Sequence, residues 1–173
     1  MVTPFGPSVA WVGAYLREVI AGKGDDDARK GANLVIGVSG KEFARCRLRG
    51  VTLTVPVEGG AHALKSRGAL PSVSEHGKWR REHEGALLAA YGKTPYYAHL
   101  MPELMAVYAD SEGLRLEDFN RRLLDVALGW IDVEAVKAEG MERVRDEVRA
   151  KVEAGLSIFD LLFRLGREGV WAL

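Results

Sequence analysis

The chain has 173 residues, of which 47% are hydrophobic, and its 24 Lys and Arg balance its 24 Asp and Glu. This length is typical of one globular domain, so we expect a single domain over residues 1–173. The balanced charge gives no global electrostatic reason to expect nucleic acid or an anionic membrane as a partner. Any basic binding site must therefore be local.

Cys46 is the single cysteine, which excludes an internal disulfide and a cysteine-based zinc cluster and fits a reducing compartment. No apolar run approaches the roughly 18 residues of a membrane span, and the N-terminus has no secretory signal pattern. We therefore expect a cytoplasmic protein that does not span a membrane.

The consecutive aspartates Asp25, Asp26 and Asp27 lack the alternation of calcium ligands, so we expect a solvated loop at residues 22–31 and no metal or cofactor.

The first elements are predicted from apolar spacing. Residues 9–20 repeat apolar side chains at helical intervals, and Ser8 can cap this helix. Residues 34–38 form a short apolar run bounded by glycines, which is typical of a buried strand. The following Gly37 to Lys41 only superficially resembles a phosphate-binding loop, because Glu42 stands where Ser or Thr is required.

Residues 43–57 contain two alternating runs around Arg49 and Gly50, a pattern that predicts a two-residue β-hairpin. This turn pairs Leu48 with Val51 and Cys46 with Leu53 on an apolar face. The other face carries two arginines and two hydroxyls, from Arg45, Arg47, Thr52 and Thr54. Such a face can receive a phosphate, carboxylate or sugar, or it can simply be the solvated face of an edge hairpin.

A helix is predicted over Trp79 to Tyr91. At 100° per residue, Trp79, Glu82 and His83 fall on one arc that we expect to face inward, with Tyr91 at its border. The pattern indicates a half-buried polar site. Glu82 and His83 either hydrogen-bond neighbouring elements or contact a substrate directly.

The second half of the chain is predicted to be almost entirely helical. Residues 117–130 are strongly amphipathic, and Asn120 lies within the apolar arc, where it is either a tether for a loop or a site residue. Residues 134–154 suggest a charged, solvent-facing helix, and Ser157 caps another helix that Gly166 ends. The apolar residues 170–173 should dock onto the domain or onto another copy of the chain, which leaves a homo-oligomer open.

Together these elements predict an α/β or α+β fold, in which a small mixed sheet with a β-hairpin is covered by four to five helices. The sheet would contain residues 34–38 and the hairpin. The C-terminal half is rich in helix, and the sequence does not fix the strand order.

Five groups of residues, in this order along the chain, resemble the WbqC-like family of bacterial proteins. They are Pro7, Trp11 and Tyr15; Arg45 to Leu48 with Leu53 to Val57; Trp79 and His83 with Tyr91 and Pro95 to Tyr97; Asp118 to Asn120; and Leu156 to Phe163. The chain departs from the family pattern at Ala44, where members often have Asn, and at Glu84, where they often have Trp.

The resemblance implies a role in O-antigen or other surface-polysaccharide biosynthesis, with transfer of an amino-acid or acyl group to a sugar or nucleotide-sugar. In that hypothesis His83 is the general base, Glu82 or Asp118 orients it or shares the proton, and Arg45 and Arg47 hold a phosphate. The expected substrate-binding residues are Arg45, Arg47, Trp79, Tyr91, Tyr96 and Asn120. The alternative is a non-catalytic protein of the same pathway that binds a small ligand or acts as a scaffold.

Overall fold

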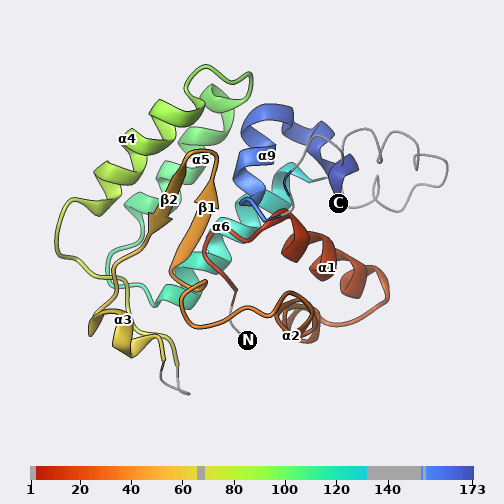
Figure 1. Cartoon of the computed structure of the whole chain (residues 1–173), viewed down its shortest axis with the longest axis horizontal. Coiled ribbons are helices and arrows are strands. Elements are labelled where there is room, and N and C mark those ends of the chain that lie inside the picture. The colour runs from red at the N-terminus through yellow and green to blue at the C-terminus, as the bar shows by residue number, and fades with distance from the viewer. Residues whose placement is uncertain (1–2, 66–68, 132–152, 154) are drawn as a thin grey trace.

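The computed structural model describes residues 3–65, 69–131, 153 and 155–173 (Figure 1). Over these residues it is a mixed α/β protein whose sheet is one antiparallel hairpin, surrounded by helices. The predicted fold class and the hairpin are therefore confirmed. The solvent-facing helix expected from residues 134–154 falls almost entirely outside the described part of the chain.

Two packed helices open the fold, α1 (Val9–Ile20) and α2 (Asp25–Ile36). Ser8 caps α1 as predicted, because its hydroxyl accepts a hydrogen bond from the Trp11 N–H at 3.2 Å. The expected strand at residues 34–38 and the expected loop at residues 22–31 were wrong. Three aspartates at the N-terminus of α2 and a left-handed Gly37 at its C-terminus (φ 70°) instead delimit a helix.

The hairpin consists of β1 (Arg45–Leu48) and β2 (Val51–Thr54) in the predicted register. Cys46 lies opposite Leu53 and Leu48 opposite Val51, and the left-handed Gly50 (φ 74°) closes the turn. Cys46, Leu48 and Leu53 are buried, whereas both arginines of β1 are exposed. The two faces of the hairpin are therefore as predicted.

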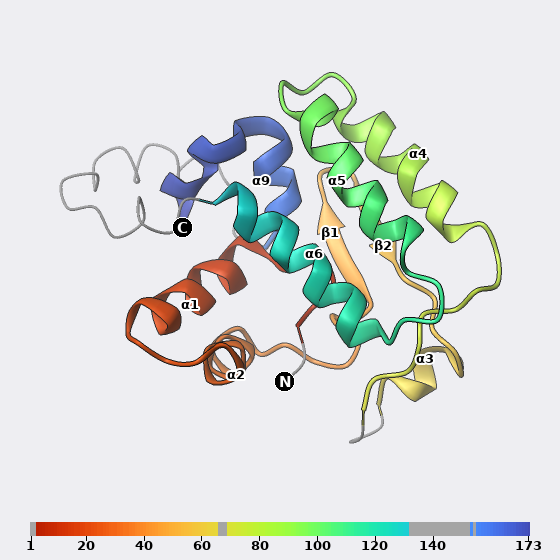
Figure 2. The ribbon, with the colours of Figure 1, turned by 180° about the vertical axis from the view of Figure 1, so that it is seen from behind.

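Helices cover the apolar face of the hairpin (Figures 1 and 2). After the short α3 (Gly60–Ala63), the chain forms α4 (Trp79–Tyr91), α5 (Tyr97–Ala109) and α6 (Leu116–Trp130). The two views show α5 and α6 across the same face of the hairpin, with α4 beside β2 and with α1 and α2 on the side of β1. Among the helices that the structure describes, none is long and apolar enough to cross a lipid bilayer.

The final elements return to the hairpin. They are α9 (Ile158–Leu165) and the 3-10 helix η1 (Gly166–Ala172). Ser157 caps α9 and Gly166 (φ 53°) ends it, as predicted. Leu173 is 8% exposed, so its side chain packs onto the protein itself.

Candidate functional site

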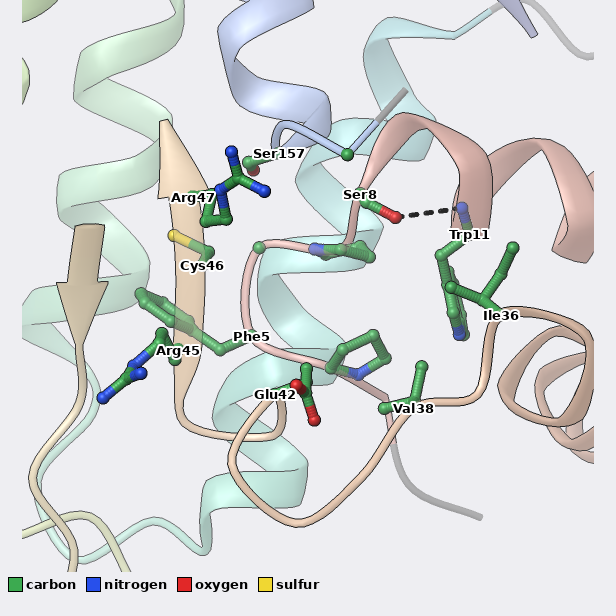
Figure 3. A pocket seen from close by; sticks show the side chains of 14 residues that line it. Phe5, Ser8, Trp11, Ile36, Val38, Glu42, Arg45, Cys46, Arg47 and Ser157 are labelled. Atoms are coloured by element: carbon green, nitrogen blue, oxygen red, sulfur yellow. Dashed lines mark hydrogen bonds between the residues drawn. The ribbon is translucent and has the colours of Figure 1, made fainter. Parts of the chain in front are cut away.

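A cavity of about 160 Å³ lies beside β1, and we call it the hairpin pocket (Figure 3). Four separate segments form it: the N-terminal residues 4–8, the end of α2 with the loop that follows it, β1, and the residues before α9. The lining residues that matter most here are Phe5, Ser8, Ile36, Arg45, Arg47 and Ser157. The sequence predicted the two arginines, and the structure places both in this one cavity.

The two arginines reach the pocket because side chains alternate along a strand. Cys46 between them points into the core, and Arg45 and Arg47 point to the outer side. Within the described part of the chain, neither arginine forms an ion pair with a carboxylate. Figure 3 shows Arg47 directed toward Ser157, with Arg45 beside Phe5. Two exposed guanidinium groups are thus available to an anionic ligand.

Backbone hydrogen bonds join the walls of the pocket around the residues that precede α9. The Ser157 N–H donates to the Arg47 carbonyl at 2.7 Å, and the Ile158 N–H donates to the Pro7 carbonyl at 2.8 Å. Gly6 lies in this junction with φ 47°, where an added Cβ would be 3.1 Å from both Cys46 Cβ and Ser157 Oγ. Both the backbone conformation and the limited space therefore favour glycine at this position.

Asn120 on α6 is a tether. Its side-chain amide is fully buried and donates to the Thr3 carbonyl at 2.8 Å and to the Phe43 carbonyl at 2.7 Å. Those carbonyls stand next to Pro4 and Glu42, which line the pocket, so Asn120 holds two of its walls in position without lining it. A direct contact between Asn120 and a substrate stays a prediction.

His83 is buried, and its ring packs against Trp79 with centroids 5.2 Å apart and against Phe5 of the pocket wall with centroids 6.0 Å apart. Its Nε2 is 3.1 Å from the Thr54 carbonyl, which can only accept, so Nε2 carries the proton and Nδ1 accepts from the Tyr108 hydroxyl at 3.0 Å. Burial lowers the pKa of His83 to about 4, against the opposing effect of the Thr54 hydrogen bond. The imidazole is therefore neutral near neutral pH and has both nitrogens occupied.

Glu82 does not face inward as expected. Its side chain is exposed, because the buried stripe of α4 follows a spacing of four residues through Trp79, His83, Leu87 and Tyr91. Trp79 and His83 are thus brought together, but Glu82 is turned away from them. Neither Trp79, Glu82 nor His83 lines the hairpin pocket. The catalytic role of Glu82 and His83 stays a prediction.

Tyr91 belongs to a third place, at the turn of the hairpin. Its hydroxyl donates to the buried carboxylate of Asp160 at 2.8 Å and accepts from the Arg49 N–H at 3.0 Å. Arg164 completes the group at 3.1 Å from Asp160. Burial raises the pKa of Tyr91 well above its usual range. This cluster fastens the hairpin turn to α9. In the sequence, Asp160 stood out only through its place in the first turn of a helix and within the Leu156 to Phe163 group that resembles the family.

Tyr96 lies just before α5 and does not line the hairpin pocket, and its N–H donates to the carbonyl of Phe163 in α9 at 3.3 Å. Its ring meets Trp130 edge-on with centroids 6.2 Å apart, and an added Cβ on Gly166 would collide with it. A role of Tyr91 or Tyr96 in substrate binding stays a prediction.

Glu42 contributes the negative charge of the pocket. The Ser39 hydroxyl and N–H both donate to its carboxylate, and the hydrogen bond from the hydroxyl is the main reason why its pKa is lowered.

Cys46 is also at the pocket wall, but burial raises the pKa of its thiol to about 12, so it is not a thiolate at neutral pH. In the described ranges, no group of three or more His, Cys, Asp or Glu residues could hold a metal ion.

The fold and the site define a mixed α/β protein with an arginine-bearing pocket beside a β-hairpin. The family model described as the WbqC-like protein family matches residues 43–152, which is more than half of the chain, so the chain belongs to that family. Comparisons with curated proteins and with solved structures found no match. Arg45 and Arg47 lie within the matched residues, whereas Phe5, Ser8 and Ser157 lie outside them.

Proposed function

We propose that this protein binds a phosphorylated sugar, such as a nucleotide-sugar, in the hairpin pocket, and that it serves bacterial surface-polysaccharide synthesis in the cytoplasm. The observation that carries the proposal is the pair of arginines, Arg45 and Arg47, which share one cavity and have no carboxylate partner among the described residues. Guanidinium groups bind phosphate oxygens in a bidentate manner.

The geometry of β1 suits a ligand with more than one phosphate. Residues two apart on a strand have Cα atoms about 7 Å apart and leave the same face. Figure 3 shows the Arg47 side chain directed toward Ser157 and the Arg45 side chain directed away from it, and both are exposed, so the two guanidinium groups can reach adjacent phosphates by rotation of the Arg45 side chain. The hydroxyls of Ser8 and Ser157 accept backbone hydrogen bonds and each keeps a hydrogen to donate. Phe5 and Ile36 supply apolar contact for the rest of the ligand.

A group transferase acting on the same ligand is the second candidate, and Glu42 favours it. Its ionised carboxylate lines the cavity and can accept a hydrogen bond from a sugar hydroxyl or amine. Catalysis by His83 would require the imidazole to give up its hydrogen bonds with Tyr108 and Thr54 and to reach a ligand past the ring of Phe5, which stacks on it.

The test is isothermal titration of the full chain with UDP-glucose and glucose 1-phosphate. Arg45→Met and Arg47→Met should each weaken binding by about 10-fold or more, since a hydrogen bond to a charged group contributes about 1.5–3 kcal/mol. Arg81→Met, an exposed arginine of α4 that does not line the pocket, is the matched control.

Unchanged affinity in both pocket variants would refute the proposed site. The transferase candidate is tested by incubating the protein with a sugar that carries an amine and with acetyl-coenzyme A, followed by mass spectrometry of the sugar. A product that forms with the wild-type chain and disappears in Glu42→Gln supports catalysis at this pocket.

A further inference from the structure

The C-terminal tip of α2 exposes three consecutive large apolar side chains, which we call the α2 tip. Leu34 is 74% exposed, Val35 is 68% exposed and Ile36 is 39% exposed. Ala28 and Ala32 occupy the buried side of the same helix, which packs against α1. Three consecutive helical positions cover about 200° of the helix surface, so the tip projects outward rather than presenting one flat stripe to a neighbour.

Exposed basic side chains lie on α2 itself, in the loop that follows it, and across the hairpin pocket from Ile36 (Figure 3). Lys30 lies one turn before Leu34 on the same side of α2, Lys41 is exposed in the loop that follows, and Arg45 and Arg47 are exposed on β1. Over the described residues, none of these four cations is paired with a carboxylate.

The acidic residues nearby are fewer or already engaged. Glu18 of α1, whose carboxylate lies beside Gly31 of α2, pairs with Lys23. Glu42 is the acidic side chain among the residues that line the pocket, and Ser39 holds it. Asp25 and Asp26 pair with Arg29 at the far end of α2, and Asp27 lies there too, about 10 Å along the helix axis from Leu34. The charge around the tip is therefore positive, although the net charge of the chain is zero.

We propose that the α2 tip docks the protein onto the surface of an anionic lipid bilayer. A bilayer offers acyl chains for apolar side chains that project from a helix end, and phosphates for cations on the same helix and at the adjoining pocket. Exposed apolar groups rimmed by polar ones mark interaction sites. A projecting tip with Lys30 on the same helix and two arginines across the adjoining pocket matches the layered chemistry of a bilayer better than the flat apolar centre and polar rim of a protein interface.

The α2 tip is continuous with the hairpin pocket. Ile36 belongs to the tip and also lines the pocket, as does Val38 in the loop that follows, and Figure 3 places both on one side of the cavity. A protein docked through the tip therefore holds the pocket beside the lipid headgroups. This inference goes beyond the proposed function, because docking requires no sugar ligand.

Co-sedimentation of the full chain with phosphatidylglycerol vesicles tests the inference, with phosphatidylcholine vesicles alongside. We expect binding to the anionic vesicles, weakening as salt is raised, and a loss of at least about tenfold in the Leu34→Ser/Val35→Ser variant. Leu88→Ser is the matched control, because Leu88 is 57% exposed on α4 and does not line the pocket. It should bind like the wild-type chain.

Absence of binding to the anionic vesicles, or equal binding by the Leu34→Ser/Val35→Ser variant, would overturn the proposal. A concentration-dependent dimer that this variant abolishes, without vesicle binding, would also overturn it and would assign the tip to a second copy of the chain. Isothermal titration of the same variant with UDP-glucose keeps the two proposals separate. Retained sugar binding with no vesicle binding rejects the docking surface alone, and vesicle binding with no sugar binding rejects the pocket ligand alone.

Discussion

Substitution of His83 by Gln tests whether this histidine is a buried neutral group. A glutamine amide can still donate to the Thr54 carbonyl and accept from the Tyr108 hydroxyl, but it does not titrate. Burial lowers the pKa of His83 from 6.5 to about 4 in the folded protein. Between these two values the unfolded chain binds more protons, so the free energy of unfolding falls as the pH falls, and it is unaffected by His83 above this range.

The size of the loss of stability follows from the lowered pKa of His83. Each pH unit within the window changes the free energy of unfolding by about 1.4 kcal/mol, so from about pH 7 to about pH 5 the wild-type protein should lose about 2 kcal/mol through His83. Urea denaturation at both pH values measures this loss. Subtracting the change found for His83→Gln removes the contribution of the carboxylates that both proteins share.

Equal losses in the wild-type protein and in His83→Gln would refute this account, as would an NMR titration of His83 with a pKa near 6.5. Either result would place His83 in contact with solvent, where it could act as a general base. The experiment therefore also bears on the transferase candidate.

Two further changes address the hairpin. Asp160→Asn should reduce the free energy of unfolding by about 2 kcal/mol, since Arg49, Arg164 and Tyr91 lose a charged buried partner; urea denaturation showing a loss below about 0.5 kcal/mol would contradict this. Cys46 should react with iodoacetamide only when the hairpin opens, because burial raises its pKa to about 12. Mass spectrometry after native labelling, compared with labelling in urea, measures this protection, and equal rates would show an accessible thiol.

The hairpin was predictable because its information is local. Arg49 and Gly50 define the turn, and strict alternation on each side then fixes the register and both faces. The outward direction of Arg45 and Arg47 follows from the same pattern. This part of the candidate site could therefore be read without knowledge of the tertiary structure.

The error at α2 arose because a short apolar run between glycines is ambiguous. Residues 34–38 satisfy the pattern of a buried strand, yet Leu34 is 74% exposed at the end of a helix. The deciding signals were the acidic residues of the first turn and Gly37 as the left-handed residue that ends the helix. An apolar composition alone predicts that residues 34–38 are buried, but composition does not determine how exposed a side chain is at the end of a helix.

The remaining pocket residues could not be predicted because they come together only in the tertiary structure. Phe5, Ile36 and Ser157 lie in three segments whose sequences carry no shared motif. Glu82 was misplaced for a different reason. When the apolar arc of a helix includes alanines, the sequence does not determine which side of the helix faces inward. The contacts of α4 with β2 and α5 decide it, and they bury the stripe that contains Trp79 and His83.

The backbone hydrogen bond from the Ser157 N–H to the Arg47 carbonyl affects when the pocket can form during protein synthesis. It joins residues 110 positions apart, and the Asn120 tether joins residues 117 apart. A nascent chain that has emerged only through α6 already carries both arginines, but it lacks the wall that the residues before α9 supply. Contacts so distant in sequence form late and slow the folding of a domain. Ligand-binding competence should therefore arise as one of the last steps in the biogenesis of this protein, after α9 has left the ribosome.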